Sequence, residues 1–168
     1  MYNIHIIKNF LPTNEFTKIQ EIVFSKKFPY YYSTVLEDSK IKNGFMFAHM
    51  LYQGRITSEY YDIISNSILS KLNLKRENLL RLKVNCYTKS SEHVKHYFHT
   101  DYRFNHKVLL LNLNDNNGYT EFENDHKVMS KANEAVIFDG NIKHRSVSQT
   151  DEDLRININL NYEEAKWK

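Results

Sequence analysis

Four residues in the C-terminal half of the chain have the types and spacing needed for metal chemistry: His99, Asp101, His144 and Arg155. In an extended segment, residues two apart point to the same face, so the His99 imidazole and the Asp101 carboxylate can meet one metal ion. His144 would add a third ligand from a distant strand. Two imidazoles and one carboxylate fill one face of an octahedron, which suits Fe(II) and leaves positions for an organic chelator and dioxygen.

The His-x-Asp triplet alone is a weak signal. With eight histidines and eight aspartates in 168 residues, chance gives about 0.4 such triplets per chain. A later histidine followed by an arginine eleven residues on, in a chain with six arginines, lowers the joint chance to below roughly one in ten. The other histidines have no equivalent arrangement, and we expect them to be structural or solvated: His5, His49, His93, His96, His106 and His126.

Length and cysteine content restrict the class of protein. A chain of 168 residues can bury one core without metal or disulfide staples, so we expect residues 1–168 to form a single domain. Cys86 is the only cysteine, which excludes an internal disulfide framework and a zinc site of several thiolates. Residues 1–10 resemble neither a signal peptide nor a membrane span, so a cytoplasmic protein without membrane association is expected.

The charges are dispersed along the chain, with 23 basic and 20 acidic residues giving a net charge of +3. Such a balance does not identify nucleic acid as a partner. The densest basic stretch is Lys71–Lys83, which we interpret as a solvated face.

Periodicity predicts two helices in the N-terminal half. Asn14–Lys27 has apolar residues at helical spacing, with Thr13 or Asn14 as its N-cap, and Ile56–Leu72 repeats the pattern. No internal repeat or linker interrupts the chain.

Strand-like alternation fills the remainder. The expected strands are Tyr30–Leu36, Phe45–Tyr52, Leu80–Tyr87, His106–Asn112, Tyr119–Glu123, Lys127–Met129, Ala135–Phe138, Arg145–Ser148 and Leu154–Tyr162. The run Asn114–Gly118 has turn chemistry. Regular short strands predict a mainly β (α+β) fold, a sandwich, barrel or jelly roll, with the two helices against one face.

The run Leu80–Tyr162 resembles the core of the 2-oxoglutarate- and Fe(II)-dependent dioxygenase superfamily, including its small phage-type and prolyl-hydroxylase-like members. The resemblance covers about half of the chain and rests on the metal pair, the distal histidine, the following arginine and three flanking segments. These segments are NNGYTEFEND (Asn116–Asp125), EAVIFDG (Glu134–Gly140) and RININLNY (Arg155–Tyr162). It implies a double-stranded β-helix over residues 80–162, preceded by helices and flanking strands in residues 1–79.

The resemblance also implies the cofactors Fe(II) and 2-oxoglutarate. Arg155 would bind the distal carboxylate of 2-oxoglutarate, because a guanidinium offers a bidentate, always-charged fork; the alternative is a surface charge on an edge strand. Asn85 and Tyr87 resemble the Asn-x-Tyr of alkylated-base demethylases, and Asn157 matches their Arg-x-Asn, as further co-substrate contacts. The second arginine of those demethylases is replaced by Asn161.

The implied activity is oxygenation by dioxygen, with hydroxylation of a substrate carbon and decarboxylation of 2-oxoglutarate to succinate. Tyr102 and Arg103 follow the metal pair and are candidate substrate contacts, although core or surface packing is the more common role of such residues. The substrate stays open among peptide, amino acid and modified nucleic acid. The oligomeric state and the branch, demethylase-like or prolyl-hydroxylase-like, are open as well.

Two other functions compete with this one. A cupin-like jelly-roll module could bind a metal or ligand without oxygenase activity, although such a module has no need to bury Arg155. A metal-dependent hydrolase is less compatible, because no additional carboxylate is spaced to act as a general base.

Overall fold

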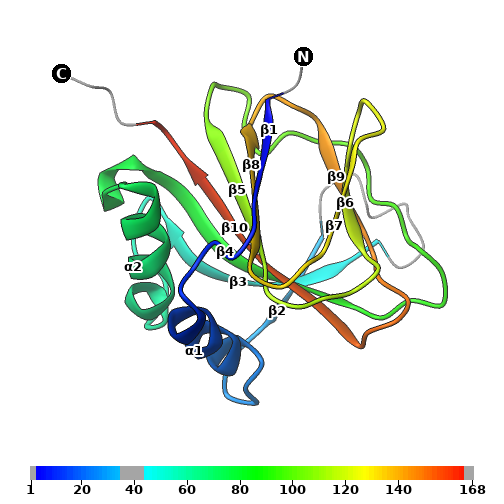
Figure 1. Ribbon diagram of the computed structural model, residues 1–168, viewed down its shortest axis with the longest axis horizontal. Coiled ribbons are helices and arrows are strands. Elements are labelled where there is room, and N and C mark those ends of the chain that lie inside the picture. The colour runs from blue at the N-terminus through cyan, green and yellow to red at the C-terminus, as the bar shows by residue number, and fades with distance from the viewer. Residues whose placement is uncertain (1–2, 35–43, 165–168) are drawn as a thin grey trace.

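The computed structural model describes residues 3–34 and 44–164. Within them the chain forms two α-helices, a single 3-10 turn and two antiparallel sheets (Figure 1). The helical elements are α1 (Thr13–Val23), α2 (Tyr61–Leu72) and η2 (Arg76–Asn78).

The large sheet has seven strands, which lie in the order β1 (Ile4–Ile7), β8 (Glu134–Asp139), β5 (Lys107–Asn112), β10 (Leu154–Tyr162), β4 (Leu79–Thr88), β3 (Met46–Gln53) and β2 (Tyr31–Ser33). The small sheet has three strands in the order β7 (Lys127–Met129), β6 (Tyr119–Phe122) and β9 (His144–Val147). Strands from both halves of the sequence therefore share the large sheet.

The molecule is layered, with the helices on one side of the large sheet and the small sheet on the other (Figure 1). Ile19 of α1 and Ile64 of α2 belong to the apolar core that includes Ile158 of the large sheet. A second apolar cluster, with Leu110 of β5 and Phe122 of β6, fills part of the space between the sheets. The prediction of a mainly β jelly roll with two supporting helices is confirmed.

Alternation along β4 and β10 sorts their side chains between these two spaces. The apolar positions belong to the core that contains the helices. The alternate positions face the small sheet, and the antiparallel register pairs them across the two strands. We call this set the polar ladder; its pairs are Arg81–Asn161, Lys83–Asn159, Asn85–Asn157 and Tyr87–Arg155.

Several element bounds differ from those predicted. The N-cap of α1 is Pro12, not Thr13 or Asn14, and the helix ends at Val23, before the expected Lys27. Helix α2 begins at Tyr61 because Ile56 instead forms a bridge with Tyr52.

The strands were predicted more closely, most bounds falling within one residue. Strand β1 was not predicted; it pairs with β8 along its whole length. The expected strand Tyr30–Leu36 is described as β2, and its positions 35 and 36 lie outside the described residues.

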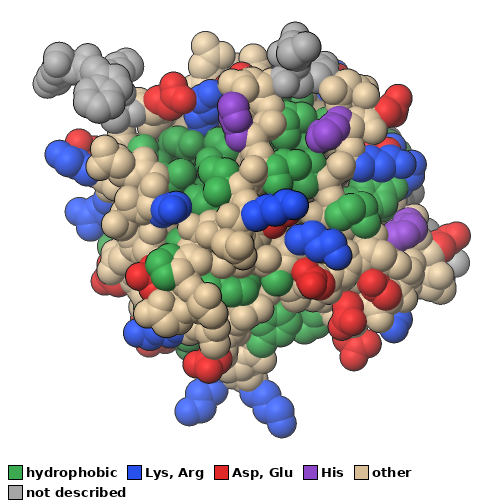
Figure 2. Space-filling view, in the orientation of Figure 1, with side chains coloured by type: hydrophobic (Ala, Val, Ile, Leu, Met, Phe, Trp, Pro, Cys, Tyr) green, Lys and Arg blue, Asp and Glu red, His purple; other side chains and the backbone are tan. Residues whose placement is uncertain are grey.

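The surface carries acidic and basic side chains interspersed on the face shown in Figure 2. No helix in residues 3–34 and 44–164 is both long and apolar enough to cross a lipid bilayer.

Candidate metal centre

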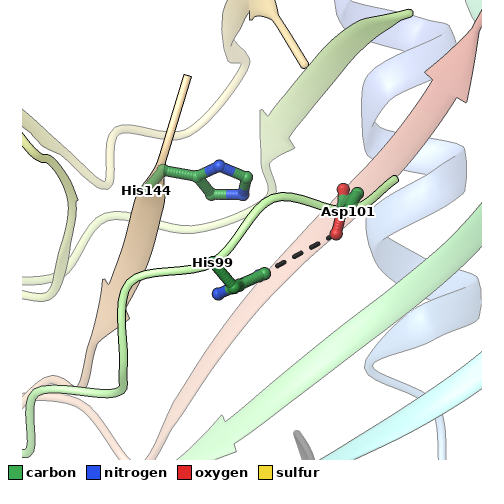
Figure 3. A group of neighbouring side chains, drawn as sticks. All are labelled: His99, Asp101 and His144. Atoms are coloured by element: carbon green, nitrogen blue, oxygen red, sulfur yellow. Dashed lines mark ion pairs between the residues drawn. The ribbon is translucent and has the colours of Figure 1, made fainter. Parts of the chain in front are cut away.

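His99 and His144 lie beside each other because their backbones form an isolated antiparallel bridge. Each backbone N–H donates to the carbonyl of the other at 3.0 Å, which leaves the ring centroids 4.8 Å apart. Asp101 follows two residues later and places Oδ1 3.8 Å from Nε2 of His99 (Figure 3). One ligand atom from each residue lies within 4.8 Å of the others, so the three predicted ligands converge.

The two histidines present the same ring nitrogen to this point. Nδ1 of His99 lies 3.2 Å from the carbonyl of Tyr97, and Nδ1 of His144 lies 3.2 Å from that of Ile142. A backbone carbonyl can only accept, so each Nδ1 donates a proton to it, and Nε2 is the nitrogen directed to the metal position in both residues. Burial lowers the pKa of His144 to about 4, which keeps its imidazole neutral at physiological pH.

Asp101 is held by the polar ladder. Arg81 Nη2 lies 2.7 Å from Oδ1, as an ion pair without the geometry of a directed hydrogen bond. The amides of Asn161 and Asn159 donate to Oδ2 at 2.7 and 3.3 Å. Burial alone would raise the pKa of Asp101, but Arg81, then His144, Lys83 and the Asn161 amide hold it well below its usual range. The carboxylate is therefore ionised and ready to ligate a cation.

Arg155 is 1 % exposed and lies at the other end of the ladder. Among the described residues its guanidinium donates only to hydroxyls: Nε to Ser130 at 2.7 Å, Nη1 to Ser146 at 2.5 Å and Nη2 to Thr120 at 3.4 Å. The Tyr87 ring lies 5.1 Å from the guanidinium carbon. No carboxylate of the described residues pairs with this cation. A buried, unneutralised charge is costly, so the site is built for an anion that the chain does not supply.

The segment around Gly118 makes room for Arg155. A Cβ atom on Gly118 would lie 2.7 Å from Cδ of Arg155, too close for any side chain without a shift. Thr120, two residues on, supplies one of the hydroxyls. In the NNGYTEFEND segment, Gly118 thus leaves space for the Arg155 side chain and Thr120 accepts a hydrogen bond from it.

One pocket extends from the metal ligands at one end of the polar ladder to Arg155 at the other. It holds about 490 Å³ of empty space, part of it open to solvent, and its walls include His99, Asp101, His144 and Arg155. Asn85, Tyr87 and Asn157 also line it, with the Asn85 amide donating to Asn157 Oδ1 at 3.0 Å.

Comparison with known proteins gives the fold but no sequence relative. No family model and no curated protein matches the chain. Among solved structures, a prolyl hydroxylase from Trichoplax adhaerens, in complex with a hypoxia inducible factor oxygen degradation domain peptide fragment, aligns with a TM-score of 0.68 and 16 % identity. The alignment covers 96 % of this chain and 84 % of that one.

Two further structures align equally well. An oxidoreductase of the 2OG-Fe(II) oxygenase family from Burkholderia pseudomallei has a TM-score of 0.68 and 8 % identity, covering 97 % of this chain and 86 % of its own. A non-heme alpha ketoglutarate dependent epimerase from nogalamycin biosynthesis has a TM-score of 0.68 and 12 % identity, covering 98 % and 77 %. The chain has the 2OG-Fe(II) oxygenase fold.

The residues at the centre of this oxygenase fold fit the cofactors. Two imidazoles and an ionised carboxylate are the donor set that suits Fe(II) with open positions. The unneutralised Arg155, in the same pocket, fits the second carboxylate of 2-oxoglutarate. The fit therefore rests on the donor set and on a buried cation that lacks an anion.

The structure also places residues in the site that the sequence interpretation missed. Lys71–Lys83 was interpreted as a solvated face, which is wrong for Arg81 and Lys83. Arg81 contacts Asp101, and Lys83 lines the pocket. The signal was available, since both are an even number of residues from Asn85 and so share its strand face.

Tyr102 and Arg103 are not among the residues that line the pocket in the described chain. The Tyr102 ring lies 5.5 Å from the Arg81 guanidinium carbon and 5.0 Å from the Phe104 ring. Arg103 is exposed. Contact of either residue with a substrate stays a prediction, and Tyr102 has a packing role beside Arg81.

Proposed function

We propose that this protein is an Fe(II)- and 2-oxoglutarate-dependent oxygenase that hydroxylates a carbon of its substrate. The observation that carries the proposal is Arg155, a buried cation whose hydrogen-bond partners within residues 3–34 and 44–164 are hydroxyls, in the same pocket as two histidines and an aspartate. A jelly-roll module that binds a metal alone gains nothing from the cost of burying this charge.

Two groups of residues have different roles in the proposed reaction. His99, Asp101 and His144 would hold Fe(II), and Arg155, with Asn85, Tyr87 and Asn157 beside it, would hold 2-oxoglutarate. When bound, the two cofactors supply activation of dioxygen, with release of carbon dioxide and succinate. The protein contributes the ligand geometry and a pocket that holds the metal ligands and Arg155 together.

The substrate class is part of the proposal. The Trichoplax adhaerens neighbour was solved with a peptide, whereas the nogalamycin neighbour is an epimerase, so the shared fold is compatible with different reactions and substrates. We retain peptide, amino acid and modified nucleic acid as classes, with hydroxylation as the default outcome.

The decisive experiment is anaerobic addition of Fe(II) and 2-oxoglutarate to the purified protein. We expect a weak visible charge-transfer band, because the keto acid chelates ferrous ion bound to the protein. The variants His99→Ala and Asp101→Ala should lose the band and all 2-oxoglutarate-dependent succinate formation. His5→Ala removes an exposed histidine of β1 and is the matched control.

The proposal fails if the native protein binds Fe(II) but gives no band and consumes no dioxygen with 2-oxoglutarate. That result would favour the cupin-like binding module. Full succinate formation by either ligand variant would likewise exclude the assignment of the three ligands.

A further inference from the structure

Lys83 is a second cation in the pocket that the proposed reaction does not use. It projects from β4 into the polar ladder and lines the same pocket as the metal ligands and Arg155. In the described part of the chain its amine forms no hydrogen bond or ion pair. Burial, with a smaller contribution from Arg81, lowers the pKa of Lys83 to about 8, so the amine is still mainly protonated at neutral pH.

The ladder register places Lys83 at the metal end. Its cross-strand neighbour is Asn159, whose amide donates to Oδ2 of Asp101. Arg155 is four residues from Asn159 along β10, roughly 13 Å of strand. The two free cations therefore serve different parts of the pocket, and Arg155 alone is placed at the far end for the distal carboxylate of 2-oxoglutarate.

The charge balance of the loaded pocket indicates what Lys83 is for. Fe(II) and Arg155 are offset by Asp101 and the two carboxylates of 2-oxoglutarate. Asp101 is the only carboxylate among the described residues that line the pocket. Arg81 and Lys83 then remain as two positive charges in excess. Arg81 is directed at Asp101 and does not line the pocket, whereas Lys83 lines the pocket at the metal end. Lys83 is therefore the excess cation that a further anion in the pocket can reach.

We propose that Lys83 binds a carboxylate of the substrate and thereby sets its position beside the metal. The substrate class is accordingly a small molecule with a free carboxylate, such as an amino acid or its N-acyl derivative. This inference rests on the proposed function, because the substrate must enter the pocket after 2-oxoglutarate.

The test uses Mn(II) in place of Fe(II), one equivalent of 2-oxoglutarate and small probes observed by proton NMR. A probe that binds near Mn(II) is broadened even when its affinity is weak. N-acetylglycine carries the carboxylate, N-acetylglycinamide is its neutral counterpart, and methyl phosphate reports recognition of a phosphate. The protein variants are Lys83→Met, Lys83→Gln and Lys18→Met, which removes an exposed lysine of α1 as the matched control.

We expect the native protein and Lys18→Met to broaden N-acetylglycine strongly and N-acetylglycinamide weakly. Loss of a charge-assisted contact should weaken N-acetylglycine binding about tenfold in both Lys83 variants. Lys83→Gln keeps a polar side chain of similar length, so it maintains the test if Lys83→Met does not fold. The 2-oxoglutarate signal should stay broadened in every folded variant.

Three results would overturn the inference: equal broadening of acid and amide, equal broadening by native protein and both Lys83 variants, or stronger broadening of methyl phosphate than of N-acetylglycine. Loss of 2-oxoglutarate binding in the Lys83 variants would also overturn it, by assigning Lys83 to the co-substrate. Absence of 2-oxoglutarate broadening in the native protein would instead reject the proposed function.

Discussion

The two faces of β10 are both buried and are chemically opposite. On β10, Ile156, Ile158 and Leu160 face the helices and are at most 1 % exposed. The alternate positions, Arg155, Asn157, Asn159 and Asn161, face the small sheet and are at most 5 % exposed. Strict alternation of polar and apolar residues on an antiparallel strand usually means that one face is solvated. Here it separates a core from a binding pocket.

Burying polar groups on the pocket side lowers the stability of the folded protein. Within the described residues, the side-chain oxygens of Asn85, Asn159 and Asn161 are buried without a hydrogen-bond partner, and no carboxylate pairs with Arg155. Each such group costs free energy of folding. The apolar face offsets this cost, since it joins the core with α1 and α2. Local violations of this kind are expected where a protein keeps residues for function rather than stability.

The substitution Arg155→Met should give the largest effect and separate the two faces most clearly. It removes the proposed anchor of the distal carboxylate, so we expect the affinity for 2-oxoglutarate to fall roughly 100-fold. It also removes an unneutralised buried charge, so the unfolding temperature without ligand should stay the same or rise. Calorimetric titration of the Mn(II)-loaded protein measures the first effect, and scanning calorimetry measures the second.

Arg55→Met, at an exposed position, is the control for loss of an arginine. If Arg155→Met lowered the unfolding temperature substantially and left 2-oxoglutarate affinity intact, the guanidinium would be a structural group. The assignment of the ladder face to ligand binding rather than to stability would then be wrong.

The opposite behaviour is expected for Ile158→Ala on the apolar face. Ile158 is 0 % exposed and belongs to the helix-side core, so truncation should lower the free energy of unfolding by about 2–4 kcal/mol. The affinity of the folded protein for 2-oxoglutarate should not change. Urea unfolding gives the stability, and Ile63→Ala, at a position 38 % exposed on α2, should lose much less.

The affinity of Ile158→Ala for 2-oxoglutarate is measured without urea, where the variant is folded. A large fall in this affinity would mean that the helix-side core sets the geometry of the ladder. The two faces would then be coupled rather than independent.

The sequence was most informative where apolar residues recur at every second position, as they do in a strand. LRININLNY (Leu154–Tyr162) predicted a strand with the bounds that the structure has, because Leu, Ile and Tyr alternate with polar residues over nine positions. His99 and Asp101 were assigned to a common face as if in a strand. The structure brings them together instead through a single bridge to His144, followed by a bend. The ligands could thus be predicted from spacing, but the way they are held could not.

What the sequence did not reveal are contacts that depend on strand register. Arg81 and Asn161 reach Asp101 together because they are partners across β4 and β10. Pairing between strands that are more than sixty residues apart is fixed by the whole fold rather than by local pattern. Strand period could place Arg81 and Lys83 on the face of Asn85, but without the register it gave neither residue a partner, and Asn161 counted only as a missing arginine.

The smallest expected effect belongs to Arg81→Met, which tests whether the ladder positions a metal ligand. Arg81 lies 2.7 Å from Oδ1 of Asp101 and would act as a positioning residue. Removing a group that orients a ligand typically weakens metal binding at least tenfold, so we expect an Mn(II) affinity about tenfold lower. Arg81→Lys should recover part of the loss, because an ammonium keeps the charge but not the fork. Calorimetric titration with Mn(II) alone provides the measurement.

Arg76→Met, an exposed arginine of η2, is the control and should bind Mn(II) as the native protein does. Tighter Mn(II) binding by Arg81→Met would contradict the positioning role, because it would mean that Arg81 competes with the metal for Oδ1. The Asn161 and Asn159 amides would then be sufficient to orient the carboxylate through Oδ2. The polar ladder would in that case hold Asp101 from β10 alone, and its β4 side would serve only the ligands in the pocket.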